Sequence, residues 1–123
     1  MAATFDAATL YALRRAAEVG IITGRSTRRP IIIWVVVAGD AVFVRSFRGP
    51  SGKWYRTAVA DGQVTLETGG RRIHGRISVV TDPSTIEAVS AAFLAKYAAS
   101  PYAGEMVRAE VLSTTLRVDP EIG

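Results

Sequence analysis

The strongest β-strand signal of the chain lies in Ile31-Ile32-Ile33-Trp34-Val35-Val36-Val37-Ala38-Gly39-Asp40-Ala41-Val42-Phe43-Val44. Its first seven residues are all apolar and mostly β-branched, which is typical of a strand buried on both faces. Pro30 stands directly before them and is compatible with the start of a strand but not with a helix. We therefore expect residues 31–37 to form a central strand of a sheet.

The dipeptide Gly39-Asp40 separates this run from a second β-type run and predicts a hairpin with a two-residue loop. The register of such a hairpin places Val36 opposite Phe43, and two residues further on it places Trp34 opposite Arg45. Stacking on the indole ring would hold the guanidinium of Arg45 in place.

A second hairpin is expected over residues 63–80, with Gly69-Gly70 as its turn. Its register pairs Glu67 with Arg72 and brings apolar residues together on the other face, so two independent patterns agree. Gly75 lies within a series of inward-facing residues. A glycine at such a position predicts a bulge or a sharp bend of the kind that barrels need.

Helices and two further strands complete the pattern. We expect a helix over Phe5–Ala17, a strand over Glu18–Thr23, a short helix over Lys53–Ala60, a longer helix from Asp82-Pro83 through Ala99, and a last strand over Val111–Val118. About six strands joined as hairpins, with helices outside, indicate a small antiparallel β-barrel of the α+β class, because closure removes open strand edges.

The composition limits the chain to one domain and excludes several chemistries. With 123 residues, of which 49% are hydrophobic, it can bury roughly two-thirds of its extended surface, enough for one core over residues 1–123. Because cysteine is absent and histidine occurs once, we expect no disulfide, thiolate zinc site, iron–sulfur cluster or other metal site. No apolar run approaches the roughly 20 residues of a membrane helix, and no signal peptide is recognisable. We expect a soluble cytoplasmic protein.

Positive charge is concentrated in the middle of the chain. Residues 25–76 hold ten basic and three acidic residues, whereas the rest holds five basic and eight acidic ones. An anionic ligand is therefore expected to meet the middle segment. Thirteen of the fifteen cations are arginine, which suits phosphate and carboxylate, although an arginine-rich genome would give the same count.

The densest candidate site is the run from Arg45 to Arg56, which holds four cations and no acid. It predicts a strand that enters a glycine-rich loop and then a short helix, whose free N–H groups and neighbouring Lys53 and Arg56 would bind a phosphate or carboxylate. Trp54 and Tyr55 add flat surfaces for a ring system. The alternative interpretation is a basic turn that is simply solvated. The spacing is too short for a nucleotide P-loop.

Two other features are weaker candidates. Gly69-Gly70-Arg71-Arg72 could be a second anion contact, but a turn with two exposed arginines explains it as well. His74 is expected opposite Thr65 on the outer face, which favours a surface residue over a general base. No Ser-His-Asp arrangement is recognisable, so no catalytic residue is assigned.

A series of short motifs lies in a fixed order along the chain: Arg28-Arg29-Pro30, Ile32-Ile33-Trp34, Gly39-Asp40, Val44-Arg45-Ser46, Gly52-Lys53-Trp54-Tyr55-Arg56, Gly69-Gly70-Arg71-Arg72, Lys96-Tyr97, Ser100-Pro101-Tyr102 and Thr114-Thr115-Leu116-Arg117. Together these motifs resemble a known bacterial family, domain of unknown function 2255, over about residues 5–120. The same order of motifs is similar, more distantly, to the split β-barrel flavin and deazaflavin oxidoreductases, which include pyridoxamine-phosphate oxidases. The resemblance implies a six-stranded split barrel, and a homodimer that binds cofactor between its subunits.

The resemblance also implies roles for residues of the middle segment. Arg45 and Ser46 match the end of the strand that lines the cofactor, and Lys53 with Arg56 match the phosphate contact. The connecting loop is shorter than in deazaflavin enzymes and lacks their histidine-proline pair. The full set of predicted cofactor-binding residues is Trp34, Arg45, Ser46, Arg48, Lys53, Trp54, Tyr55 and Arg56.

Three functions compete at this point. The first is an oxidoreductase that binds flavin mononucleotide (FMN) or a deazaflavin and transfers hydride between this cofactor and a small organic acceptor. The second is a non-catalytic binding module for an anionic aromatic ligand. The third is a nucleic-acid-binding barrel, which is less favoured because the cations do not form one run and the pattern places several aromatic residues near a core.

Overall fold

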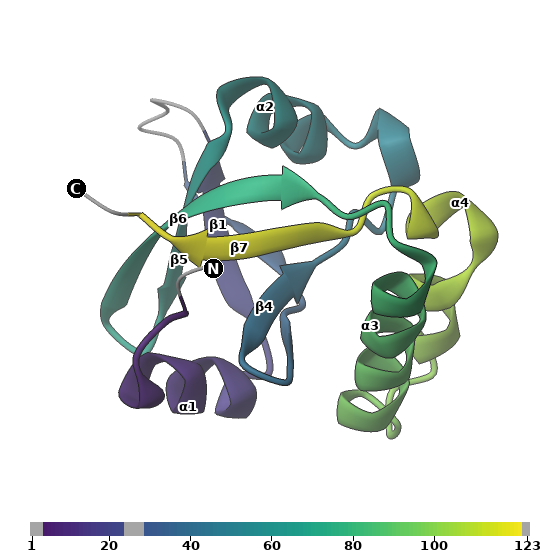
Figure 1. Ribbon diagram of the computed structural model, residues 1–123, viewed down its shortest axis with the longest axis horizontal. Coiled ribbons are helices and arrows are strands. Elements are labelled where there is room, and N and C mark those ends of the chain that lie inside the picture. The colour runs from purple at the N-terminus through teal and green to yellow at the C-terminus, as the bar shows by residue number, and fades with distance from the viewer. Residues whose placement is uncertain (1–3, 24–28, 122–123) are drawn as a thin grey trace.

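The computed structural model describes residues 4–23 and 29–121, which form a curled antiparallel sheet with helices around it (Figure 1). The sheet has seven strands in the order β2-β1-β5-β6-β7-β4-β3, so the prediction of six strands is wrong by one. The strands are β1 (Val19–Thr23), β2 (Ile31–Ile33), β3 (Val36–Ala38), β4 (Ala41–Val44), β5 (Gln63–Thr68), β6 (Arg71–Val79) and β7 (Leu116–Pro120).

The extra strand arises because residues 31–37 do not form one central strand, as was predicted. They form β2 and β3, which lie at the two opposite edges of the sheet. In β2, Ile31 and Ile32 are 47% and 60% exposed, so this segment is not buried on both faces. The prediction failed because the apolar run is divided between two edge strands. The first part, β2, pairs with β1, and the second part, β3, pairs with β4.

The connection between these two edges forces the sheet to curl. Only Trp34 and Val35 separate β2 from β3, so the Cα atoms of Ile33 and Val36 lie at most about 11 Å apart. The two outer strands of a seven-stranded sheet can approach this closely only if the sheet bends round on itself. The result is a split barrel, in which the two edge strands, β2 and β3, come close together but do not pair with each other.

Both hairpin registers are confirmed. Val36 pairs with Phe43, and Glu67 pairs with Arg72, whose Nε lies 2.8 Å from the Glu67 carboxylate. Of the two alternatives predicted at Gly75, the bulge is wrong, because the pair of Val64 and Gly75 belongs to an uninterrupted ladder between β5 and β6. Gly75 is instead required by close packing, since an added Cβ would collide with the side chain of Val118.

The three predicted helices are confirmed. Asp6 caps the first helix by accepting a hydrogen bond from Thr9 N at 2.8 Å, and Asp82 caps the third in the same way from Thr85 N at 2.9 Å. The start of the last predicted strand is wrong, because a short helix occupies residues 109–112. The helices are α1 (Ala7–Arg15), η1 (Gly49–Ser51), α2 (Lys53–Asp61), α3 (Pro83–Lys96), η2 (Ala103–Val107) and α4 (Ala109–Leu112).

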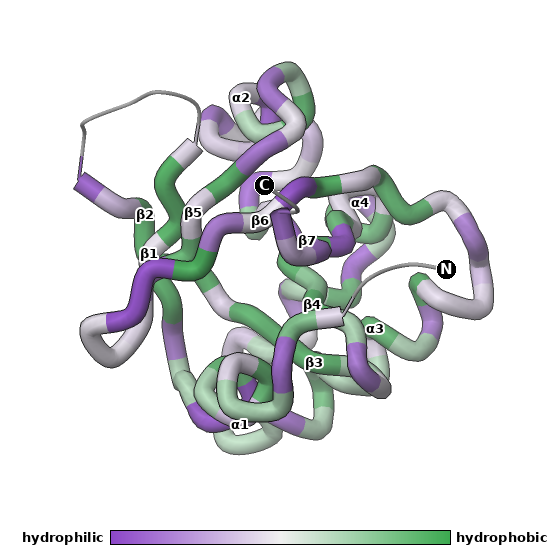
Figure 2. The backbone as a smooth tube through the Cα atoms, turned by 60° about the vertical axis from the view of Figure 1, so that its left-hand side comes forward, coloured by the Kyte–Doolittle hydropathy of each residue, from purple (hydrophilic) through white to green (hydrophobic). Residues whose placement is uncertain are grey.

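Two hydrophobic clusters hold the layers together. The larger one fills the curled sheet and is closed by α1 and α2, which lie on opposite sides of the strands in Figure 2. It includes Leu13 of α1 and Ala58 of α2, both fully buried. The smaller cluster joins α3 to the outside of β3 and β4 and includes Phe93 and Phe43. Alternate residues of β4 therefore serve both clusters.

Arg45 is the buried charge that attaches α3 to the sheet. It is 1% exposed, follows β4, and donates four hydrogen bonds to uncharged acceptors. These are Thr115 Oγ1 at 2.8 Å, and Ser90 Oγ, Met106 O and Ile86 O, each at 2.9 Å. Burial lowers the pKa of Arg45 to about 10, so the guanidinium stays protonated at neutral pH.

The predicted stacking of Arg45 on Trp34 is wrong. Arg45 lies over the ring of Phe93, 5.4 Å from its centroid, and Trp34 stacks on Tyr97 with centroids 3.9 Å apart. The hairpin register stops at Val36, so the extrapolation two residues further does not hold. The chain leaves β3 at this point to reach the other edge of the sheet.

Residues at the end of α3 hold the connection between the edges. The Tyr97 hydroxyl donates to Ala17 O at 2.9 Å and accepts from Val35 N at 3.2 Å. The Lys96 ammonium donates to Val35 O at 2.7 Å and to Leu13 O at 3.0 Å. The backbone polar groups of Val35, which have no strand partner, are thereby satisfied.

Replacing Arg45 is expected to be strongly destabilising. Arg45→Met would leave two backbone carbonyls and a buried hydroxyl without a donor, which predicts a loss of about 2–4 kcal/mol in the free energy of unfolding. Arg45→Lys should recover part of it, since an ammonium cannot reach all four acceptors. Urea unfolding measures the loss, with exposed Arg56→Met as the control, expected within about 0.5 kcal/mol of wild type. An equally stable Arg45→Met protein would contradict this role.

Lys96 is expected to make stability depend on pH. Burial lowers its pKa from 10.5 to about 8. Between these two values the folded protein binds fewer protons than the unfolded chain, so the free energy of unfolding should rise with pH, and below about pH 8 this dependence should vanish. Urea unfolding from about pH 7.5 to about pH 9.5 measures the slope. Lys96→Met should flatten it, whereas exposed Lys53→Met should leave it unchanged.

Candidate functional site

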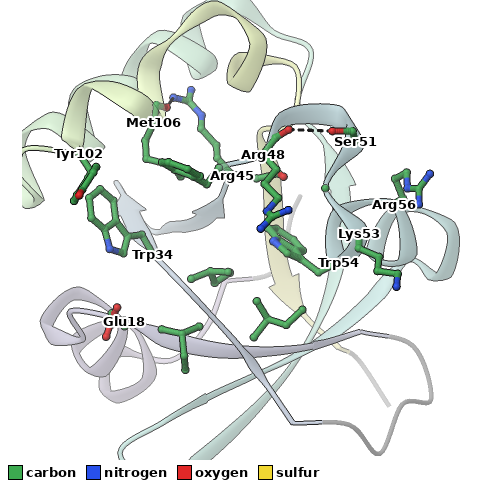
Figure 3. A pocket seen from close by; sticks show the side chains of 16 residues that line it. Glu18, Trp34, Arg45, Arg48, Ser51, Lys53, Trp54, Arg56, Tyr102 and Met106 are labelled. Atoms are coloured by element: carbon green, nitrogen blue, oxygen red, sulfur yellow. Dashed lines mark hydrogen bonds between the residues drawn. The ribbon is translucent and has the colours of Figure 1, made fainter.

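A cavity of about 860 Å³ runs along β2, where the split barrel is open (Figure 3). Its walls come from β2, from the chain that leaves β4, from η1 and the start of α2, and from the segment that holds Tyr102 and Met106. The volume lies within the range of roughly 300–1,000 Å³ that is usual for small-molecule sites. The cavity follows the edge of β2 that pairs with no other strand among the described residues, so it exists because the barrel is open at this place.

One end of the cavity is built to attract an anion. Gly52 precedes α2 and provides no side-chain cap, so the first N–H groups of this helix have no side-chain acceptor in the part of the chain that the structure describes. Arg48, Lys53 and Arg56 are exposed around it and line the cavity. The N-terminus of a helix beside three cations favours phosphate or carboxylate groups.

Ser46 lies behind this end and is 1% exposed. Its Oγ atom is buried and has no hydrogen-bond partner among the described residues. A Cβ on Gly52 would collide with this atom, so Gly52 lets the start of α2 approach the serine closely. A buried hydroxyl without a partner costs free energy, which marks this place as one where a further polar group would be stabilised.

Two tryptophans line the cavity in different ways. Trp34 is half-buried and stacks on Tyr97 with an angle of 5° between the ring planes, so one face of the indole is covered. Trp54 is 9% exposed and belongs to the core, with its ring edge-on to Tyr55. Phe47 and Tyr102 also line the cavity and are exposed.

The cavity brings together seven of the eight residues predicted to bind a cofactor. Tyr55 lies outside it, and its hydroxyl donates to Ser113 O at 3.4 Å. Arg45 lines the cavity, but its guanidinium points away, toward α3 and Met106 (Figure 3). The residues of the set that line the cavity are Trp34, Arg45, Ser46, Arg48, Lys53, Trp54 and Arg56.

Several lining residues were missed by the sequence analysis. Glu18, Ile31, Ile32, Tyr102 and Met106 come from three segments that are distant in the sequence. The pairing of β1 with β2, which brings the first of them to this place, was not predicted. The sequence predicts the strand over Glu18–Thr23 but not its partner, and residues 24–28 between the two strands lie outside the described residues.

The remaining positive charge of the middle segment lies elsewhere. Arg71, Arg72 and Arg76 are exposed on β6 and do not line the cavity, so the suggested second anion contact is separate from it. His74 is exposed on the same strand, with Nδ1 3.0 Å from Thr65 Oγ1, as predicted. Arg25 and Arg28 lie outside the described residues.

Two observations bear on broader function classes. Two of the aromatic rings that could stack on nucleic-acid bases are buried, because Phe43 is 3% and Trp54 9% exposed. Within residues 4–23 and 29–121, no helix is long and apolar enough to cross a membrane.

The fold is shared with solved structures of low sequence identity, and no curated protein matches the sequence. The heme storage protein HutZ from Vibrio cholerae has a TM-score of 0.66 at 16% identity, over 95% of this chain and 91% of that one. The conserved hypothetical protein Rv2991 from Mycobacterium tuberculosis gives 0.65 at 12%, over 95% and 79%. A FAD-binding protein from Mesorhizobium loti gives 0.56 at 13%, over 99% and 94%. These similarities confirm the split-barrel fold.

The sequence itself matches one protein family. Residues 9–118 match the family described as "Uncharacterized protein conserved in bacteria (DUF2255)". This range contains all seven strands except the last two residues of β7, and the whole candidate site. The predicted resemblance is thereby confirmed, and the chain belongs to the DUF2255 family.

Proposed function

We propose that this protein binds FMN or a deazaflavin in the cavity along β2 and transfers hydride between the bound cofactor and a small organic acceptor. The observation that carries the proposal is the form of the cavity, in which a cationic helix N-terminus adjoins a wall with two indole rings. These cofactors combine a flat ring system with phosphate. The split-barrel fold, shared with a FAD-binding protein, supports the same conclusion.

The residues at the start of α2 fit a phosphate group. Lys53 and Arg56 would neutralise its charge, while the free N–H groups of the helix would donate to its oxygens. The buried Ser46 hydroxyl, which has no partner among the described residues, is a further donor at this place. The same set would bind the phosphate of either cofactor, so this end does not select between them.

The other residues would orient the ring and exclude water. The isoleucines of β2 and the indole of Trp54 provide an apolar wall for the ring, and Trp34, which is held by Tyr97, continues this wall away from α2. The bound cofactor supplies the hydride chemistry. A binding module for an anionic aromatic ligand would use the same contacts without turnover, which makes catalysis a separate question for experiment.

Haem is the second candidate, because a structural neighbour is a heme storage protein and the cavity holds two side chains of types that ligate haem iron. These are Tyr102, which is 61% exposed, and Met106, which is 3% exposed. The usual ligand, histidine, does not line the cavity, since His74 lies on the outer face of β6. The cavity therefore fits a flavin better.

A homodimer is part of the proposal, with the second copy covering the open side of the cavity. The unpaired edge of β2 exposes Ile31 and Ile32, and exposed Phe47 and Tyr102 line the same cavity. An exposed apolar surface of this kind beside a strand edge favours association. We also propose a cytoplasmic location.

The cofactor prediction is tested with purified protein and two double variants. Flavin absorbance should shift on titration with FMN or a deazaflavin, and the melting temperature should rise. Lys53→Ala with Arg56→Ala should weaken binding at least about tenfold, because two charge-assisted contacts are lost. Arg71→Ala with Arg76→Ala makes the same change in charge outside the cavity and should bind as wild type.

The outcomes separate the candidates. If neither cofactor changes the absorbance or the melting temperature, the proposal fails, and a Soret shift on titration with hemin would then favour haem. If a cofactor binds but its reduced form does not transfer hydride to a quinone or nitro dye in the presence of the protein, the binding module is favoured.

The dimer prediction concerns the β2 edge. Ile32→Glu should convert a dimer to a monomer, because a carboxylate would have to be buried without a partner in the interface. Light scattering after size-exclusion chromatography measures the mass. Leu94→Glu is the matched control, since Leu94 is 45% exposed on α3 and does not line the cavity. A wild-type monomer would contradict this part of the proposal.

A further inference from the structure

The cavity has a second end with the opposite charge. Glu18 lies there, directly before β1, and among the described residues it is the only acidic side chain that lines the cavity. Figure 3 shows Glu18 on the side of the cavity away from Lys53 and Arg56. Glu18 is exposed and forms no ion pair with any residue that the structure describes.

The ladder between β1 and β2 brings Glu18 next to an aromatic stack. Val19 pairs with Ile33, so the next positions along the two chains are Glu18 and Trp34. Both side chains line the cavity, and Figure 3 shows them on the same side of it. Tyr97 covers one face of the Trp34 ring at 3.9 Å, which holds the indole in one orientation beside the carboxylate.

The charges around Glu18 leave its carboxylate available. Burial raises the pKa of Tyr97 and the Glu18 carboxylate raises it further, so the phenol stays neutral. Lys96 of α3 directs its ammonium to the backbone carbonyls of Leu13 and Val35. The side chain of Tyr102 adds a second exposed ring to the wall of the cavity.

A carboxylate beside an indole ring attracts positive charge by two mechanisms. The carboxylate attracts a cation directly, and the negative face of an aromatic ring attracts it through the cation–π interaction. A flat cation can stack on the ring and face the carboxylate at once. The same place repels phosphate, so an anionic group is directed to the α2 end.

We infer that Glu18 and Trp34 form a second subsite, which accepts a planar, positively charged group such as a pyridinium ring. The inference rests on the cavity of the proposed function but not on the identity of its cofactor. Glu18 selects by charge, and Trp34 provides the stacking surface. A molecule bound here would be the reaction partner that meets the cofactor ring, and its charge would distinguish it from neutral and anionic competitors.

The test compares two probes that differ in one methyl group and one charge, 1-methylnicotinamide and nicotinamide. In the Trp54→Phe variant, Trp34 is the only tryptophan, so saturable quenching of its fluorescence reports binding at this end. We expect the cation to bind about three- to fivefold more tightly, as suits one exposed charge pair. The shift of the Trp34 indole N–H resonance gives the same comparison in the wild-type protein.

Two matched variants assign the preference to Glu18. Glu18→Gln keeps the size of the side chain and should bind both probes equally, whereas Glu87→Gln, an exposed change on α3, should retain the preference. Equal affinities in the wild type, or a preference that survives Glu18→Gln, would overturn the inference. Binding of FMN or a deazaflavin without a charge preference overturns the subsite alone, and a charge preference without binding of either cofactor supports the subsite and contradicts the cofactor.

Discussion

Trp34 and Val35 join the two outer strands of a seven-stranded sheet, and most of the architecture depends on this short connection. A two-residue connection cannot cross an open sheet of this width, so the sheet has to curl until its edges meet. Lys96 and Tyr97 make the connection possible, because they satisfy the polar backbone groups of Val35 that no strand can pair. The edges come together without closing, and the cavity is the space that remains along β2.

Arg45 connects the curled sheet to the candidate site. Its guanidinium bonds to groups from α3, η2 and the start of β7, so the end of β4 is fixed from three sides. The chain that leaves this anchored residue carries Ser46 and Arg48 and then enters α2. A buried cation without a carboxylate partner is costly. The position of the loop that surrounds the anion-binding end depends on that charge being satisfied by neutral acceptors.

The parts of the fold that could be predicted are those decided by neighbours in the sequence. The turns at Gly39-Asp40 and Gly69-Gly70 set both hairpin registers, and Asp82-Pro83 sets the start of α3. The run at 31–37 could not be placed, since hydrophobicity does not say which strand a segment pairs with, or that an edge strand will leave Ile32 exposed.

One end of the candidate site could likewise be predicted from the sequence, and the other could not. The cationic end could be predicted because Arg48, Lys53 and Arg56 are close together in one loop and helix. The opposite end could not, because Glu18 reaches the cavity only through the pairing of β1 with β2. Tyr55 follows Trp54 on α2, and one helical step of about 100° takes it out of the cavity.

The separation of charge along the cavity suggests how a protein with few reactive side chains could direct a reaction. The chain has no cysteine, and its one histidine lies on the outer face of β6, away from the cavity. The cavity instead places charged and aromatic groups at fixed positions. Cations and helix N–H groups lie at one end, and a carboxylate and an indole held by Tyr97 lie at the other. Under the proposed function, a phosphate-bearing cofactor at one end and a cationic reaction partner at the other would bring their rings together between the two ends. Positioning of this kind contributes to catalysis when the bound molecules supply the reacting atoms.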